Sequence, residues 1–203
     1  MREIVLDTET TGFRQNDGDR IVEIGCLELV NHVATGNNYH QYINPERDMP
    51  LEAFGVHGLS EEFLSDFPVM ADVMEGFLEF IGDDTPLVIH NAEFDMRFVN
   101  AELNHLGMTP LPMSRSIDTV RMAREKFPVA PASLDALCRR FSIDNASRTL
   151  HGALLDAELL AEVYLELIGG RQTGLELDQN KVSETVASQE TQRREPRLYA
   201  ASD

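Results

Sequence analysis

Four carboxylates occupy positions where several acids could meet. Asp7 and Glu9 close the apolar run in IVLDTETTG, so a strand would deliver both side chains to its own end. Asp95 falls in the first turn of a predicted helix, and Asp156 shares the apolar stripe of another. Like charges brought together repel each other, and divalent cations offset that repulsion. Oxygen ligands without cysteine or clustered histidine favour Mg²⁺ or Mn²⁺ over zinc.

Each acid also has a purely structural explanation. Asp95 could interact with the dipole of its helix, Asp7 could cap a turn, and Asp156 could pair with an arginine. These separate explanations weaken when the acids are taken together, because a buried acid without a partner is costly. The sequence therefore favours one shared metal site.

His151 is a candidate proton acceptor. It lies five residues before Asp156, and five helical steps turn about 500°, so the two side chains cannot share one face of a regular helix. The turn-like NASRTLHG and Gly152 therefore predict His151 on the loop before the helix. A neutral imidazole beside a polarised water is a suitable general base near pH 7. The alternative is an ordinary exposed histidine.

Hydrophobic periodicity predicts a mixed α/β order for the elements that carry these residues. A hairpin with its turn at Gly36 links the second and third strands. Strands are expected at residues 3–7, 20–30, 37–45, 86–90 and near 115–120. Helices are expected at residues 71–82, 93–106, 119–127, 133–141 and 152–170. The apolar pattern ends there, so we expect one domain over residues 1–170 and a flexible Gln- and Glu-rich linker over 171–203.

The net charge of −18 argues against a nucleic-acid partner, because phosphates are normally contacted by lysine and arginine. The clustering of the basic residues weakens that argument. Seven basic residues lie within one span: Arg115, Arg121, Arg124, Lys126, Arg139, Arg140 and Arg148. A solvated helix face and a phosphate-binding track explain this span equally well.

No apolar run approaches the roughly 20 residues of a membrane helix, and the N-terminus lacks the pattern of a signal peptide. We therefore expect a cytoplasmic protein with no membrane partner. Cys26 and Cys138 lie in apolar contexts without metal-ligand spacing, which is typical of reduced core residues.

Three motifs, LDTETTG, HNAEFD and HGALLDA, resemble those of the DEDD-type 3′-to-5′ exonucleases that use a histidine base. The H-x-x-x-x-D spacing of the third separates the histidine subgroup from the tyrosine subgroup. Each motif alone is weak, but all three in this order are specific. The resemblance implies a ribonuclease H-like α/β fold, with a central mixed five-stranded sheet flanked by helices.

Longer stretches, including GNNYHQYINP and EAFGVHGLS, resemble the family of proofreading epsilon subunits of bacterial DNA polymerase III. This resemblance implies two divalent cations, Mg²⁺ or Mn²⁺, and His151 as the base. It implies as metal ligands Asp7, Glu9, Asp156 and, partly through water, Asp95. It also implies substrate contacts from Glu52 and His57 besides Asp7, Glu9 and Asp156. Apart from the resemblance, EAFGVHG is only a turn-rich stretch.

The resulting hypothesis is a metal-dependent exonuclease that removes mispaired nucleotides from a DNA 3′ terminus as 5′-monophosphates. An RNA-trimming exoribonuclease of the same family would use the same motifs. A non-catalytic interaction scaffold is the third alternative, and the complete set of acids with His151 argues against it.

Two protein partners follow from the resemblance. Epsilon subunits usually continue past a Gln-rich linker into a segment that binds the polymerase alpha subunit, and the chain stops at RLYAASD, so we expect that segment to be missing. The hexapeptide QTGLEL at 172–177 resembles a sliding-clamp motif with Gln172, Leu175 and Leu177 as anchors. Alternatively, the two leucines fold back onto the last helix.

Overall fold

The sheet has five strands, as expected. The computed structural model describes residues 1–146 and 150–169. The strands are β1 (Arg2–Thr10), β2 (Ile21–Val30), β3 (Val33–Tyr42), β4 (Leu87–Ile89) and β5 (Ser116–Asp118), in the order β3-β2-β1-β4-β5. β1 pairs antiparallel with β2 and parallel with β4, so the predicted mixed sheet is confirmed. The predicted linker and clamp motif lie outside the described residues, and the domain boundary near residue 170 stays a prediction.

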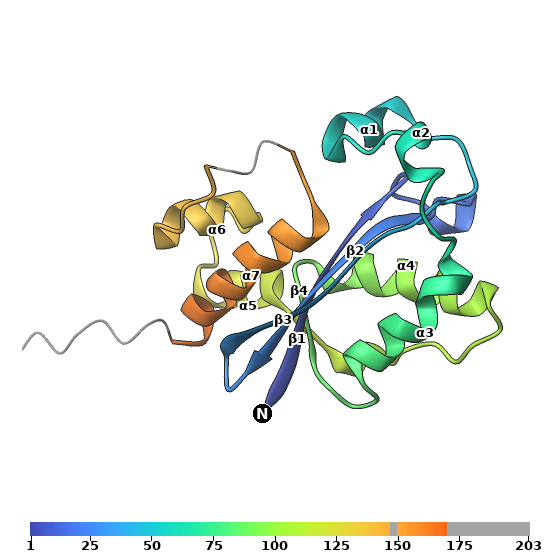
Figure 1. Ribbon diagram of the computed structural model, residues 1–203. Coiled ribbons are helices and arrows are strands. Elements are labelled where there is room, and N and C mark those ends of the chain that lie inside the picture. Colours follow the sequence, from blue (N-terminus) through green and yellow to red (C-terminus); the bar gives the residue numbers. More distant parts are fainter. Residues whose placement is uncertain (147–149, 170–203) are drawn as a thin grey trace, which may run out of the picture. The chain divides into compact units, whose positions relative to one another are not determined.

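Helices cover both faces of this sheet (Figure 1). They are α1 (Leu51–His57), α2 (Glu61–Leu64), α3 (Met70–Ile81), α4 (Ala92–His105), α5 (Thr119–Lys126), α6 (Leu134–Phe141) and α7 (Ala153–Ile168). Short 3-10 turns occur at Gln15–Asp17 and Met113–Arg115. α3 and α4 pack on one face with Leu6, whereas α5, α6 and α7 pack on the other with Val5. Because side chains alternate along a strand, β1 is buried on both sides.

None of the helices among the described residues has the length and apolar character needed to cross a membrane. Cys26 and Cys138 are both buried in the core, as predicted.

The hairpin between β2 and β3 turns earlier than predicted. Asn31 and His32 both have positive φ, 52° and 65°, and form a two-residue turn between the strands. Such a turn matches the twist of the paired strands, and asparagine tolerates this backbone region. Gly36 instead lies inside β3, beside the register shift between Leu27 and Leu29. The prediction that Gly36 forms the turn was therefore wrong.

Two helices, α1 and α2, fall where the sequence indicated only a turn-rich stretch. α1 carries Glu52 and buries His57, but it leaves Leu51, Phe54 and Val56 exposed. Its apolar residues therefore do not form a core-facing stripe that periodicity could detect. α2 begins at a serine cap, with Ser60 Oγ accepting from the Phe63 amide at 3.1 Å.

The contact between α7 and β2 positions the site. Asp7 lies opposite Gly25 in the antiparallel pair. A β-carbon on Gly25 would lie 2.3 Å from both the Ala153 carbonyl carbon and the Leu154 nitrogen. Only the missing side chain allows the first turn of α7 to rest directly on the sheet at this point. That approach brings Asp156, in the first turn of α7, to the same part of the sheet as Asp7.

Candidate active site

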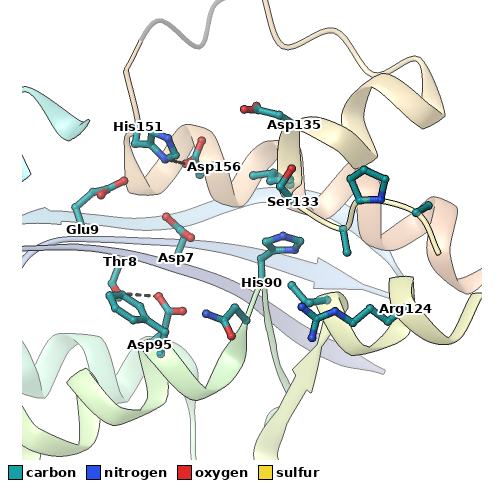
Figure 2. A pocket seen from close by; sticks show the side chains of 17 residues that line it. Asp7, Thr8, Glu9, His90, Asp95, Arg124, Ser133, Asp135, His151 and Asp156 are labelled. Carbon is teal, nitrogen blue, oxygen red and sulfur yellow. Dashed lines mark hydrogen bonds and ion pairs between the residues drawn. The ribbon is translucent and has the colours of Figure 1, made fainter. Parts of the chain in front are cut away.

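The five residues singled out by the motifs line one cavity of about 690 Å³ (Figure 2). They are Asp7, Glu9, Asp95, His151 and Asp156. β1 runs through Thr10 and so carries the first two acids within the strand rather than at its exit. Asp7 and Glu9 are two residues apart, so they point to the same face of the sheet. Figure 2 shows them on the side of Asp156, with Asp95 on the side of α4.

The tightest group in this cavity consists of Glu9, His151 and Asp156. Among the described residues, these three offer ligand atoms that all lie within 4.8 Å of one another. The two carboxylates are buried and the histidine is exposed. His151 Nδ1 lies 3.3 Å from Asp156 Oδ2. The group differs from the predicted ligand set, because it includes the proposed base and omits Asp7 and Asp95.

His151 lies before the helix, where the sequence predicted it. Gly152 is the N-cap of α7, and its carbonyl accepts from the Asp156 amide at 2.9 Å. The His151 amide donates to the Val56 carbonyl of α1 at 3.1 Å. The neighbouring Leu150 side chain covers Gly58, where an added β-carbon would lie 2.6 Å from Leu150 Cδ1. The loop that carries His151 is therefore held against the end of α1.

Asp95 is buried, with 3% of its surface exposed, and this burial changes the pKa of its carboxyl group. Thr8 Oγ1 donates to Asp95 Oδ1 at 2.7 Å. Burial raises the pKa of Asp95 to about 7, although the Thr8 hydrogen bond favours the ionised form and opposes the shift. A cation bound beside the carboxylate would lower this pKa again. The carboxyl is thus suited to exchange its proton for a metal ion near neutral pH.

The raised pKa of Asp95 makes the stability of the metal-free protein depend on pH. In the unfolded chain this carboxyl ionises near pH 3.9, whereas in the folded protein it keeps its proton up to about pH 7. Between these values the folded state binds more protons, so the free energy of unfolding falls as pH rises. Asp95→Asn removes the ionisable group and with it this loss of stability at higher pH. We expect the variant to gain stability over wild type from pH 4 to pH 8.

Urea unfolding in EDTA across this pH range measures the effect. The matched control is Asp66→Asn, a surface aspartate after α2, which should follow wild type. Parallel pH curves for Asp95→Asn and wild type would contradict the assignment of a raised pKa.

A second cavity, of about 360 Å³, adjoins the first. It is lined by Glu52 and His57 and shares Thr8, Glu9, Phe94 and His151 with the larger cavity. The structure thus places the two predicted nucleotide contacts beside the carboxylates, on a helix rather than on a turn. Glu52 is exposed.

His57 is a buried, neutral donor in this second cavity. Burial lowers the pKa of His57, while Glu23 and the Thr10 carbonyl pull it upward more weakly. Its Nδ1 accepts from the Leu59 amide at 3.0 Å, which assigns the ring proton to Nε2. Among the described residues, this buried Nε2 makes no hydrogen bond of regular geometry, and the Thr10 carbonyl is the backbone acceptor that favours its proton. A ligand in this cavity could accept a hydrogen bond from Nε2.

Sequence reasoning missed several residues that line the two cavities. Phe13 lies in the second cavity, is 75% exposed, and packs edge-on against Phe94 with ring centroids 6.2 Å apart. His90 and Arg124 line the first. The sequence did contain signals that could have identified them. Phe13 is an aromatic residue directly after LDTETTG, His90 belongs to the HNAEFD motif, and Arg124 belongs to the basic span.

Comparisons with known proteins agree with this geometry. The exonuclease family model matches residues 4–164, which include all the motif residues. DNA polymerase III subunit epsilon of Rickettsia conorii is 54% identical over 192 residues, covering 93% of this chain and 83% of that protein. The subunit of the same name from Escherichia coli is 49% identical over 178 residues, covering 84% of this chain and 72% of that protein.

Solved structures share the fold. Exonuclease X in complex with 5′ overhanging duplex DNA has a TM-score of 0.64 at 25% identity, with 81% of this chain and 90% of that chain covered. The nuclease domain of 3′hExo, a DEDDh family member bound to rAMP, has a TM-score of 0.70 at 16% identity, with 82% and 91% covered. The second likeness concerns the fold alone.

Proposed function

Because the chain belongs to the exonuclease family, we propose that it is the proofreading 3′-to-5′ exonuclease of a replicative DNA polymerase. It removes mispaired nucleotides from the 3′ end of a DNA primer as 5′-monophosphates. The observation that supports this proposal most is the convergence of the three motifs on one cavity, where buried Glu9 and Asp156 meet His151.

The donor set fits divalent cations. The ligand atoms of Glu9, Asp156 and His151 lie within 4.8 Å of one another, and five carboxylates line the cavity. We propose that two Mg²⁺ or Mn²⁺ ions are held by Asp7, Glu9, Asp95 and Asp156. When bound, such ions make water more acidic and stabilise the leaving 3′ oxygen.

His151 is proposed to accept the proton of the attacking water. Its Nδ1 faces Asp156 Oδ2 at 3.3 Å, which fixes the ring and assigns Nε2 as the basic nitrogen. The exposed ring can pass the proton on to solvent. In this proposal Asp156 both orients the His151 ring and acts as a ligand of the cation.

The terminal nucleotide is proposed to occupy the second cavity, between α1 and the carboxylates. The Nε2–H of neutral His57 offers a hydrogen bond there, and exposed Glu52 lies on the same helix. Phe13 and Phe94 present aromatic surface to the same cavity. A base that has frayed from its partner can occupy such a site, whereas a paired base remains stacked in the duplex.

Association with DNA polymerase III is proposed from the named relatives. The polymerase alpha subunit is the partner that the resemblance to epsilon subunits suggests for this association. The proposed clamp contact uses Gln172, Leu175 and Leu177, which lie outside the described residues. Equal binding of a sliding clamp by wild type and by the triple alanine variant would remove this motif from consideration.

The function is tested on a DNA primer with a mispaired 3′ end. We expect rapid release of nucleoside 5′-monophosphates, slower release from a matched end, and no release in EDTA until Mg²⁺ or Mn²⁺ is restored. A short single-stranded RNA serves as the competing substrate. Undiminished hydrolysis in EDTA would refute the metal mechanism, and faster trimming of RNA than of mispaired DNA would favour the exoribonuclease alternative.

A further inference from the structure

Arg124 brings a positive charge to the cavity of the carboxylates. It projects from α5 and lies beyond His90 as seen from Asp7 (Figure 2). Among the described side chains that line this cavity, it is the one with a permanent positive charge, against five carboxylates. No acidic side chain among the described residues lies within ion-pair distance of it. Within the described part of the fold, its guanidinium is therefore not used in an ion pair, although its place in the last turn of α5 suits the helix dipole.

The other members of the basic span have structural roles where they can be assigned. Arg115 donates to three backbone carbonyls at and just after the end of α3. Lys126 donates to two carbonyls in the last turn of α7. Arg121 pairs with Glu125, and Arg140 stacks over the Phe127 ring at 4.3 Å. Four of the seven basic residues therefore make contacts within the fold.

The surroundings of Arg124 have a fixed geometry. The Thr119 hydroxyl donates to the Ile89 carbonyl at 3.2 Å, so its oxygen accepts from His90 Nδ1 at 2.9 Å. This pair anchors the His90 ring between the carboxylates and Arg124 (Figure 2). α5 itself is anchored by Asp118, whose carboxylate accepts from the Val120 amide at 2.9 Å. Arg124 thus projects from a firmly placed helix.

The two cavities set the direction of a bound strand. They share the wall formed by Thr8, Glu9, Phe94 and His151. If the terminal nucleotide occupies the smaller cavity and the scissile phosphate lies at the carboxylates, the rest of the strand leaves through the larger cavity, past Arg124. We propose that Arg124 binds the phosphodiester next to the scissile one on its 5′ side. This inference rests on the proposed function and adds a second phosphate site to it.

A guanidinium suits this task, because its planar donors match phosphate oxygens and it remains charged at every working pH. One charge-assisted contact of this kind, partly open to solvent, is worth about a tenfold change in affinity. Losing it should also reduce the dependence of log affinity on log salt by about 0.7 for single-stranded DNA.

The test compares a substrate that has the neighbouring phosphate with one that lacks it. A single-stranded DNA trinucleotide has it, and the p-nitrophenyl ester of thymidine 5′-monophosphate does not. Arg124→Gln should raise KM for the trinucleotide about tenfold with little change in kcat, and should leave hydrolysis of the ester unchanged. The matched control is Arg139→Gln, which removes the same charge from an exposed position on α6 outside both cavities. It should leave both substrates unaffected.

A methylphosphonate at the neighbouring linkage removes the same charge from the DNA. It should raise KM for wild type about as much as Arg124→Gln does, and should add little in the variant. The inference would be overturned if Arg124→Gln impaired hydrolysis of the trinucleotide and of the ester equally. It would also be overturned if the methylphosphonate raised KM as much in the variant as in wild type. Failure of wild type to hydrolyse either substrate with Mg²⁺ or Mn²⁺ would instead overturn the proposed function, and this site with it.

Discussion

Asp7→Ala is expected to reduce hydrolysis of a mispaired primer to background while the protein stays folded. Asp7 is half-buried on β1, in the cavity that contains Glu9 and Asp156, so its carboxylate contributes both ligand oxygen and like-charge repulsion. Removing the oxygen should weaken cation binding and cost roughly a thousandfold or more in turnover. Removing the repulsion should leave the metal-free protein as stable as wild type or slightly more stable.

Three measurements on one preparation check this result: primer degradation, calorimetric titration with Mn²⁺, and thermal unfolding in EDTA. Asp66→Ala removes the same group from the exposed surface and serves as the control. Near-normal primer degradation by Asp7→Ala would exclude Asp7 from the metal site. A large loss of stability in EDTA would show that the carboxylate has a structural role.

His151→Gln is expected to lower turnover by roughly 10² to 10⁴, the usual range for removing a general base. Glutamine can keep the hydrogen bond to Asp156 but cannot accept the proton. Turnover should also lose the part of its pH dependence that reports ionisation of the base. Cation affinity should persist, because the proposed role of His151 is proton transfer.

Cation affinity is the decisive measurement, since His151 belongs to the group whose ligand atoms lie within 4.8 Å of one another. If affinity for Mn²⁺ falls in parallel with turnover, His151 is a ligand and the base must be sought elsewhere. His105→Gln, at the exposed end of α4, controls for loss of a histidine. It should change neither quantity.

The parts of the fold that the sequence predicted are those with dense local signals. α7 buries Asp156 together with Leu159, Leu160, Val163 and Leu167, the stripe expected from helical spacing. The strand at residues 20–30 and the helix at 71–82 lie within one or two residues of β2 and α3. The position of His151 before α7 followed from its angular offset from Asp156.

The parts that were missed depend on contacts without a local signal. The hydrogen bond from Thr8 to Asp95 joins residues 87 positions apart, so nothing near either residue predicts it. α1 exposes most of its apolar side chains and is tied to the rest of the fold by contacts such as the bond from His151 to Val56. The close approach of Glu9, His151 and Asp156 required the packing of three separate elements.

Gly25 shows how a residue without functional groups can set the spacing of those that have them. Any side chain there would need the backbone of Ala153 and Leu154 to lift away from β2. His151 and Asp156 flank that segment and would move with it, whereas Glu9 would stay on β1. If every residue were substituted in turn and activity measured, substitutions at position 25 should therefore be as harmful as those at the catalytic positions. A list of substrate-contacting residues would not include Gly25, so the two results should differ at this position.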